Sequence, residues 1–178
     1  MNEPEGIKPY FKGPLTLRQG LKFKFRAGCI PLNSKLAHIH KCSRACSLCG
    51  AEVEDIPHFI LHCPKLKTLR DALVSEISES ATKTVLDSFN GLEDLLKAAA
   101  ILSDSFWGDA QESINQCVMT FLADAWKLRC NHMYGAQSHY WVEPADSVGV
   151  KGISEGSAFI SQLHSQECGV NGLQTKAR

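Results

Sequence analysis

The chain has 178 residues, a hydrophobic share of 44% and 19 basic against 19 acidic residues, a composition ordinary for a globular protein of one or two compact units. The first residues show no basic and apolar leader, and no apolar run reaches the roughly 18 residues that cross a membrane, which argues against a secreted or membrane protein. Eight cysteines without such a leader predict reduced thiols and metal binding in a nuclear or cytoplasmic setting.

The neutral total hides a basic half and an acidic half. Residues 8–45 carry nine lysines and arginines and no acid, whereas residues 71–125 carry ten acids and two lysines. This split predicts that the first half faces a polyanion, while the second half is solvated or faces a partner. The cations expected to contact nucleic acid are Lys22, Lys24, Arg26, Lys35, Lys41 and Arg44.

The first predicted element is a helix, because Leu17, Leu21 and Phe25 recur at helical spacing. A strand is the alternative, since Leu21, Phe23 and Phe25 also alternate. The phenylalanines can stack on nucleic-acid bases, although burial in the core is the commoner role of this side chain. A loop is expected from Gly28 to Ser34.

Cys46, Cys49, His58 and Cys63 follow the spacing Cys-x2-Cys-x8-His-x4-Cys. Three thiolates and one imidazole at this short spacing predict a closed tetrahedral site for one structural Zn²⁺. Gly50, directly after the second cysteine, can adopt the left-handed backbone that the turn between the ligands needs. A site filled by four protein ligands has no open position for a catalytic water.

The second half of this site is expected on a short helix that carries His58. Pro64 biases Cys63 away from helical geometry, so the chain bends where the fourth ligand is needed. Two other side chains are alternative ligands. His62 lies one helical turn after His58, and Cys42 precedes the first cysteine of the motif.

Three apolar stripes downstream predict helices that pack as a small bundle behind the zinc-binding module. Turn residues from Ser88 to Gly91 separate the first two stripes, and Asp109 is expected to cap the third helix. From residue 135 scattered glycines and serines predict a flexible tail. The stripes are Leu66, Leu69, Leu73 and Ile77; Leu92, Leu95, Leu96, Ala99 and Leu102; and Ile114, Val118, Phe121, Leu122, Ala125 and Leu128.

The predicted fold is therefore mainly α, with a small Cys3His zinc-binding module followed by a helical bundle and a flexible C-terminal tail. The expected divisions are residues 8–75 for the basic segment with the zinc-binding module, 76–134 for the acidic helical region and 135–178 for the tail.

Several short motifs occur in a fixed order along residues 15–75. They are Lys24-Phe25-Arg26-Ala27-Gly28-Cys29-Ile30-Pro31-Leu32-Asn33, Cys46-Ser47-Leu48-Cys49-Gly50, Glu54-Asp55, His58-Phe59-Ile60-Leu61, Cys63-Pro64 and Arg70. Together they resemble the zinc-binding module that follows the polymerase in LINE-type (non-LTR) retrotransposon reverse transcriptases. A weaker similarity covers Ala125-Trp126-Lys127-Leu128-Arg129-Cys130, which resembles a helix often found downstream in that family.

The resemblance implies nucleic-acid handling without polymerisation. The sequence contains no adjacent pair of aspartates for a polymerase palm, and its length leaves no room for a polymerase or an endonuclease, so no enzyme is expected. The expected function is a zinc-stabilised module that binds the backbone of RNA or DNA through its basic N-terminal segment. A reverse transcriptase in another chain is a further expected partner. The alternative is a protein-interaction module with purely structural zinc, which docks a partner through the acidic helical half.

Overall fold

The computed structural model describes residues 16–135, and within this range the chain is helical and contains no strand. The mainly α fold predicted from the sequence is confirmed, whereas the predicted flexible tail lies outside the described residues. The α-helices are α1 (Leu17–Arg26), α2 (Asn33–His40), α3 (Lys67–Ser80), α4 (Lys83–Asn90), α5 (Asp94–Leu102) and α6 (Gln111–Tyr134). The shorter elements are a π turn (His58–His62) and two 3-10 segments (Pro64–Leu66 and Gly108–Ala110).

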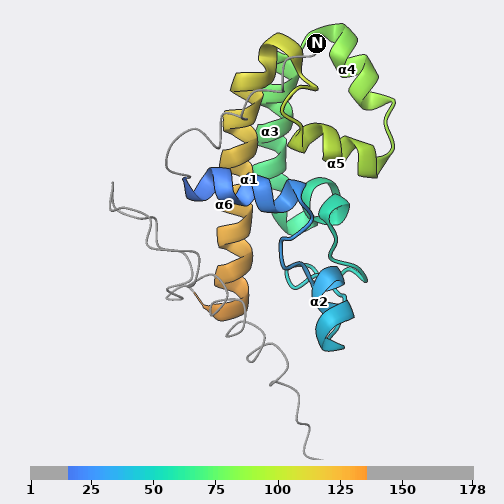
Figure 1. The fold of residues 1–178 in the computed structure, drawn as a ribbon, viewed down its shortest axis with the longest axis vertical. Coiled ribbons are helices and arrows are strands. Elements are labelled where there is room, and N and C mark those ends of the chain that lie inside the picture. The colour runs from blue at the N-terminus through green and yellow to red at the C-terminus, as the bar shows by residue number, and fades with distance from the viewer. Residues whose placement is uncertain (1–15, 136–178) are drawn as a thin grey trace, which may run out of the picture.

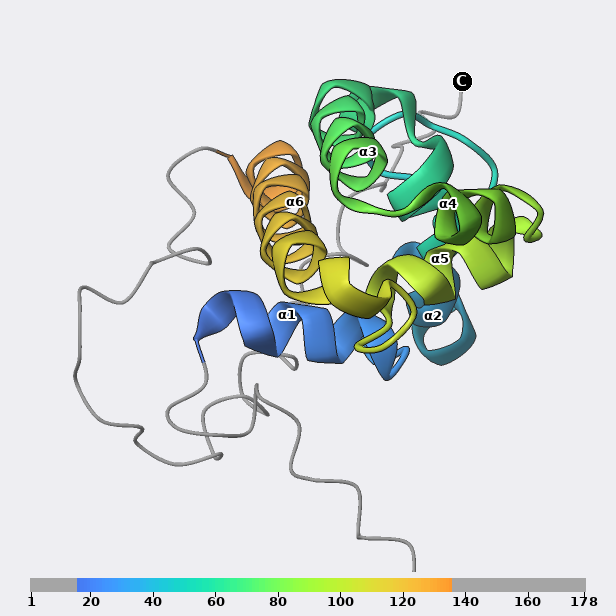
Figure 2. The same cartoon turned by 90° about the horizontal axis from the view of Figure 1, so that it is seen from above.

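Helix α6 is the longest element, and the other elements are arranged around it. Figure 1 shows α3 alongside α6 and α1 crossing in front of α6, and Figure 2 shows α1 and α3 in contact with different sides of α6. The predicted apolar stripe of α6 faces this core, with one exception, since Leu128 is 40% exposed. The members that are buried as expected are Ile114, Val118, Phe121, Leu122 and Ala125.

Helix α1 confirms the helical reading of the first apolar pattern. Thr16 and Gln19 form a reciprocal capping box at its start, which satisfies amide groups that would otherwise lack a partner. Leu21 and Phe25 are buried one helical turn apart, and Phe23 lies on the opposite side with 42% of its surface exposed. The alternation of apolar residues therefore does not reflect a strand.

The Phe25 ring connects α1 with the later parts of the chain. It lies 5.3 Å from the ring of Phe59 in the π turn and 6.2 Å from the ring of Trp126 in α6, in the second case edge to face. Such aromatic pairs contribute about 0.5–1.5 kcal/mol beyond their buried area. The burial of Phe25 confirms the core role expected for this side chain.

Two helices occupy segments that were predicted as loop or turn. Helix α2 begins at Asn33, inside the loop expected from Gly28 to Ser34, and its first amides are held by side-chain and backbone acceptors from later in the chain. Helix α4 continues through the turn expected from Ser88 to Gly91 and ends at Asn90. For α2 these tertiary contacts outweigh the local turn propensity, whereas in α4 the turn residues Asn90 and Gly91 stand at the C-terminal end of the helix.

The stripe predicted to face the core on α5 is wrong for its first leucines, although Leu102 at its end is buried as expected. Leu95 and Leu96 are 67% and 52% exposed, whereas Ala98 and Ile101 are buried. The buried face contacts Trp107, whose indole N–H donates to the Ala100 carbonyl at 3.1 Å. Small alanines allow this close approach of the helix backbone to a large ring, so the helix turns Leu95 and Leu96 outward.

The start of α6 also differs from the expectation. Asp109 lies in the 3-10 segment just before α6, and α6 has no side-chain cap at its N-cap residue. The Gln111 side chain instead accepts a hydrogen bond from the Trp107 amide at 3.0 Å and donates to the Ser103 carbonyl at 3.0 Å. An amide side chain can serve both a donor and an acceptor of the preceding loop, which a carboxylate cannot.

One hydrophobic cluster joins the cysteine-rich segment to the bundle. It includes Cys46 and Cys63 from that segment, Leu73 and Ile77 from α3, and Phe121 from α6. The predicted division after residue 75 falls inside α3, within this shared core. No helix in the described range has the length and apolar character needed to traverse a bilayer.

Candidate metal centre

The side chains of Cys46, Cys49, His58 and Cys63 converge, and their possible ligand atoms all lie within 4.8 Å of one another. The Cys46 and Cys63 sulfurs are 3.9 Å apart, and the Cys49 sulfur is 3.3 Å from His58 Nε2. Sulfurs bound to one tetrahedral zinc at about 2.3 Å are separated by about 3.8 Å. The four side chains are therefore positioned to hold one metal ion, as the spacing predicts.

The first two ligands lie on a tight turn. The Cys46 amide donates to the Ala51 carbonyl at 2.7 Å, and the Gly50 amide donates to the Cys46 carbonyl at 2.8 Å. Gly50 has φ +75°, the left-handed region that costs a residue with a Cβ about 1–2 kcal/mol. Both sulfurs of the Cys-x2-Cys pair consequently face the same point.

The third and fourth ligands are brought together by a π turn. The Asp55 carboxylate accepts the His58 amide at 2.8 Å and so caps the start of this turn. The Cys63 amide donates to the His58 carbonyl, five residues earlier, at 2.7 Å. Because a π turn is wider than an α turn, the side chain above His58 is Cys63 and not the residue four positions on. Cys63 then has ψ 115°, an extended geometry that the following Pro64 favours.

Neither alternative ligand joins the cluster. His62 points away from it, is about half exposed, and places Nε2 2.7 Å from the Asp94 carboxylate on α5. Cys42 is half-buried and lies outside the group. Among residues 16–135 the four predicted ligands form the single set of three or more such side chains close enough to share an ion.

The environment of the site favours uncharged ligands. Burial raises the pKa of the Cys46 thiol to about 12 and also raises the pKa of the Cys63 thiol. Burial lowers the pKa of His58, so its imidazole is neutral near pH 7. A metal cation supplies the positive charge that stabilises thiolates in such a place, and it binds an imidazole in its neutral form.

A buried carboxylate beside the ligands is a feature that the sequence did not reveal. Glu54 is fully buried, and its Oε1 accepts from the Ser47 hydroxyl at 3.1 Å and lies 3.6 Å from the Cys46 sulfur. Arg129 of α6 donates to both of its oxygens, from Nε at 3.0 Å and from Nη2 at 2.8 Å. Burial acts to raise the pKa of Glu54, but these bonds and the charge of Arg129 bring it below the ordinary value, so Glu54 is ionised.

The same pair also holds α2. Glu54 Oε2 accepts the Asn33 amide at 3.0 Å, and Arg129 Nη2 donates to the Asn33 side-chain oxygen at 3.1 Å. The Asn33 side chain further donates to the Ala45 carbonyl, next to the first ligand, at 2.6 Å. The guanidinium of Arg129 lies 5.0 Å from the Trp126 ring centroid. Glu54 and Arg129 therefore tie α2, the cysteine turn and α6 together.

Arg70 of α3 supports the far side of the site. Its guanidinium donates to the Cys63 carbonyl at 3.0 Å and to the Ile60 carbonyl at 3.4 Å. The Cys63 carbonyl also accepts the Leu66 amide at 3.1 Å, so Arg70 adds a second, charged donor there and ties α3 to the π turn. Glu54, Arg70 and Arg129 all lie within the motifs that carry the family resemblance. Those motifs were the sequence signal that could have indicated the structural role of these three residues.

The predicted cationic surface is divided by the fold. Lys22 is only 3% exposed, and its ammonium donates to the Asp104 carboxylate at 2.9 Å, to the Ser103 carbonyl at 3.3 Å and to the Asn115 side chain. Burial and then the charge of Arg26 lower the pKa of Lys22 from 10.5 to about 8. Arg26 itself pairs with Asp104. Lys22 is therefore enclosed in the molecule, whereas Arg26 remains on the surface with its charge paired and its side chain 38% exposed.

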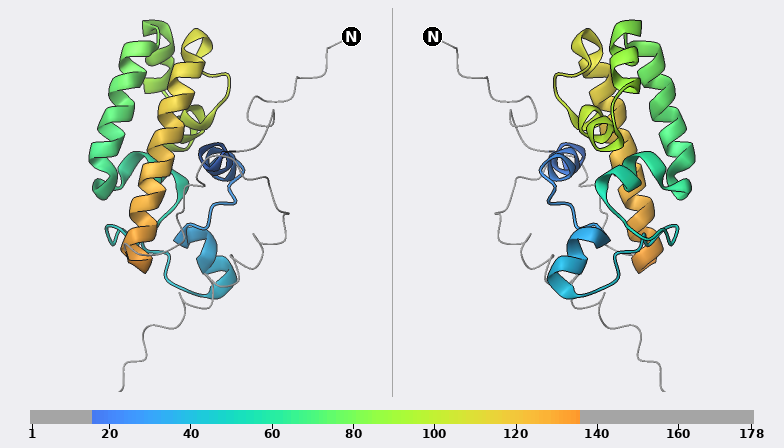
Figure 3. Two further views of the ribbon diagram at one scale, coloured as in Figure 1. Left: turned by 90° about the vertical axis from the view of Figure 1, so that its left-hand side faces the viewer. Right: turned by 90° about the vertical axis from the view of Figure 1, so that its right-hand side faces the viewer.

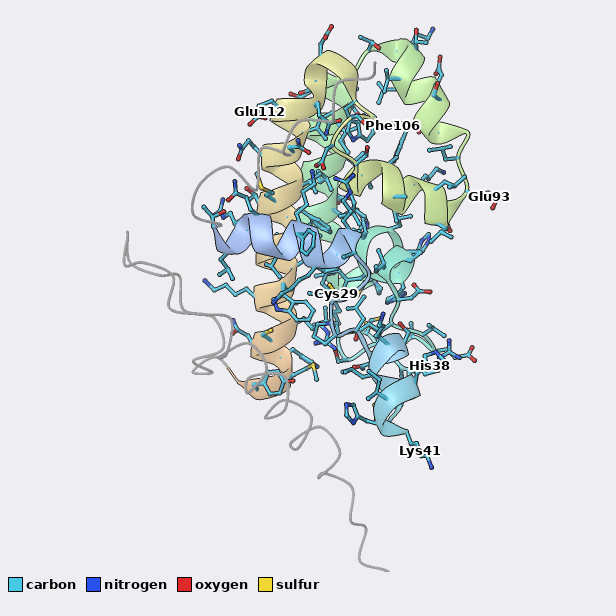
Figure 4. All side chains as sticks on the ribbon, in the orientation of Figure 1. Cys29, His38, Lys41, Glu93, Phe106 and Glu112 are labelled. Atoms are coloured by element: carbon cyan, nitrogen blue, oxygen red, sulfur yellow. The ribbon has the colours of Figure 1, made fainter. Side chains whose placement is uncertain are left out.

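The other predicted cations are exposed. Lys24 lies on α1, Lys35 on α2, and Lys41 closes α2 in a left-handed conformation with φ 53°. Figure 4 shows Lys41 at the tip of α2, with its side chain pointing away from the helical body. Arg44 follows on the segment that leads to the first ligand. Lys35 also donates to the Gly28 carbonyl at 2.9 Å, a bond on the surface.

Comparisons with protein-family models, with curated proteins and with solved structures found no match.

Proposed function

We propose that the chain is a zinc-stabilised nucleic-acid-binding module that contacts the backbone of RNA or DNA through its exposed N-terminal cations. The observation that carries this proposal is that the Cys3His cluster follows, and in part belongs to, a segment whose exposed charges are all positive. Residues 16–51 carry seven lysines and arginines and neither aspartate nor glutamate. The contacting cations are Lys24, Lys35, Lys41 and Arg44. Of the six cations predicted, Lys22 is left out because it is buried and Arg26 because it pairs with Asp104.

The donor set supports zinc as the metal. Three thiolates and one imidazole suit a soft to borderline ion in tetrahedral geometry, and they leave no position for a substrate or a catalytic water. The metal would then be structural, and the module would not be an enzyme.

Metal binding would also order the cationic segment. The Arg44 carbonyl accepts the Glu54 amide at 2.8 Å, and the Ala45 carbonyl accepts the Asn33 side chain at 2.6 Å. The segment between α2 and the first ligand is thus clamped at both of these residues. An ion that holds Cys46 in place fixes Lys41 and Arg44 relative to α1 and α2, which reduces the entropy lost when they bind phosphates.

The resemblance to the reverse transcriptase module of LINE-type elements supports the same function. In that family the module is thought to hold template RNA or target DNA for the polymerase, which another chain would supply here. The motifs that carry the resemblance contain the four ligands and also Glu54 and Arg70, which contact them or their backbone.

The salt dependence of polynucleotide binding tests this function. The affinity of the zinc-loaded protein for a labelled single-stranded and a labelled duplex 20-mer is measured by fluorescence anisotropy over a series of salt concentrations. A triple variant, Lys24→Gln with Lys41→Gln and Arg44→Gln, is expected to reduce the slope of log affinity against log salt by about 2 to 3. The matched control, Lys65→Gln with Lys67→Gln and Lys83→Gln, removes three exposed charges elsewhere and should leave the slope unchanged. Absence of binding even at low salt would overturn the proposal.

One observation favours a second candidate, a protein-interaction module that docks through the acidic half. Leu95 and Leu96 are exposed on α5 next to Glu93 and Asp94. An exposed apolar pair beside acids is typical of a surface that binds another protein. This candidate stands if polynucleotides fail to bind.

A further inference from the structure

Helix α2 presents one open face to solvent. Of its eight residues only Leu36 is buried, on the side that faces the module. Lys35, His38 and Ile39 are exposed at positions three and four apart, which places them on one side of the helix, and Ile39 is 61% exposed. An apolar side chain and two nitrogen-bearing side chains thus share a free helical surface.

The helix lies at one end of the molecule. Figure 1 and Figure 3 show α2 at the opposite end from α4, below the crossing of α1 and α6. The N-terminal end of α2 is fixed to the rest of the module, because the Glu54 side chain accepts the Asn33 amide and the Glu54 carbonyl accepts the Ser34 amide. A rigidly held helix at the edge of a small domain is suited to enter a groove of a partner.

The backbone amides at the start of α2 already have hydrogen-bond acceptors within the protein. The amides of Lys35 and Leu36 both donate to the Leu32 carbonyl, at 2.9 and 3.0 Å. Together with the two amides held by Glu54, these bonds occupy the donors that a helix start would offer to a phosphate. A polyanion must therefore contact the side of α2 and the cations around its C-terminal end.

The dimensions of α2 fit one kind of groove better than another. An α-helix is about 10–12 Å across with its side chains, and eight residues extend about 12 Å. The major groove of B-form DNA is about 12 Å wide and admits a helix, whereas the major groove of A-form RNA is deep and too narrow for one.

We propose that α2 enters the major groove of duplex DNA, with His38 and Ile39 facing base edges and with Lys35, Lys41 and Arg44 at flanking phosphates. An imidazole can hydrogen-bond to base edges in this groove, and an aliphatic side chain can contact the thymine methyl group. This inference rests on the proposed nucleic-acid function and narrows its ligand to B-form duplex DNA.

The test compares three duplexes of one sequence with the zinc-loaded protein at one salt concentration. The first is DNA, the second is RNA, and the third is DNA in which every cytosine is replaced by glucosylated hydroxymethylcytosine, a bulky group in the major groove. The protein should bind the unmodified DNA about tenfold or more tightly than either of the others, because only this duplex has a major groove that is both wide and unobstructed.

Variants locate the contact on α2. Lys41→Glu and Arg44→Glu should each weaken binding to unmodified DNA by about tenfold, whereas Lys83→Glu on α4 makes the same charge change at the other end of the molecule and should not. Ile39→Ser should weaken binding to unmodified DNA with an unchanged salt slope, since it removes no phosphate contact. Zinc content and circular dichroism confirm that each variant is folded.

The outcomes separate this inference from the proposed function. Equal affinity for RNA and DNA duplexes, or undiminished affinity for the glucosylated duplex, would overturn the groove contact while leaving backbone binding in place. Failure of every polynucleotide to bind would overturn both.

Discussion

Arg129 donates from Nε and Nη2 to the two carboxylate oxygens of Glu54, at 3.0 and 2.8 Å, across 75 residues of sequence. Both side chains are almost completely buried, at 2% and 0% exposure. The carboxylate also lies against the hydroxyl of Ser47 and the sulfur of Cys46, so one ion pair links the long helix α6 to the metal ligands.

Removal of one partner of this ion pair should strongly destabilise the folded protein. Arg129→Met leaves the buried Glu54 charge uncompensated, and the expected loss is about 3–5 kcal/mol of unfolding free energy. Chemical denaturation of the zinc-loaded protein measures it. Lys127→Met, on an exposed position of the same helix, is the control and should change stability by less than about 0.5 kcal/mol. The double variant Glu54→Gln with Arg129→Met should recover part of the loss, because no unpaired charge remains.

The metal site should depend on Cys63 and not on His62. Protein purified without added metal should contain one zinc per chain, and Cys63→Ser should lose the metal and the folded module with it. His62→Ala should keep the metal, since His62 faces Asp94 on the surface. Elemental analysis with circular dichroism checks both. A folded wild-type protein free of metal would contradict the prediction, as would metal loss from His62→Ala.

The buried lysine on α1 should make stability depend on pH in the alkaline range. The pKa of Lys22 falls from 10.5 to about 8 on folding, mainly through burial, so the unfolded chain binds the proton more tightly. Between these two pH values the unfolded state carries more protons, and stability therefore rises with pH. The unfolding free energy of the wild type relative to Lys22→Met should accordingly increase from pH 8 to pH 10.5 and stay level below pH 8. A difference that is flat or falls across this window would show that Lys22 keeps its proton in the fold.

Because α5 buries Ile101 and exposes Leu95, the two residues should differ in how much their substitution lowers the free energy of unfolding. Ile101→Ala removes a buried side chain and should cost about 2–4 kcal/mol. Leu95→Ala removes a side chain that is 67% exposed and should cost less than about 1 kcal/mol. Thermal and chemical denaturation compare the two variants on the same helix. Similar losses would place Leu95 in the core after all.

The four candidate metal ligands could be predicted because they are local. Cys46, Cys49, His58 and Cys63 lie within one short segment, and Gly50 and Pro64 impose the turns that bring them together. Spacing and backbone preference are properties of the sequence itself, so they indicate the ligand set before any folding is known. The same holds for the stripe of α6, whose helical period is long and regular.

The orientation of α5 could not be predicted in this way. Its sequence is apolar on nearly every side, so periodicity identifies a helix without deciding which face is buried. The deciding contact is with Trp107, which packs against the alanine side of the helix.

The sequence by itself determined the helical class, the four candidate ligands and the uneven distribution of charge, because each depends on residue type and on spacing along a short stretch of chain. The tertiary structure alone decided that Lys22 is enclosed by Asp104 and Asn115 and that Glu54 meets Arg129. These partners come from segments distant in the chain, and a buried charge is tolerated only where the fold supplies an opposite charge or hydrogen bonds. Which cations remain on the surface is therefore a result of packing.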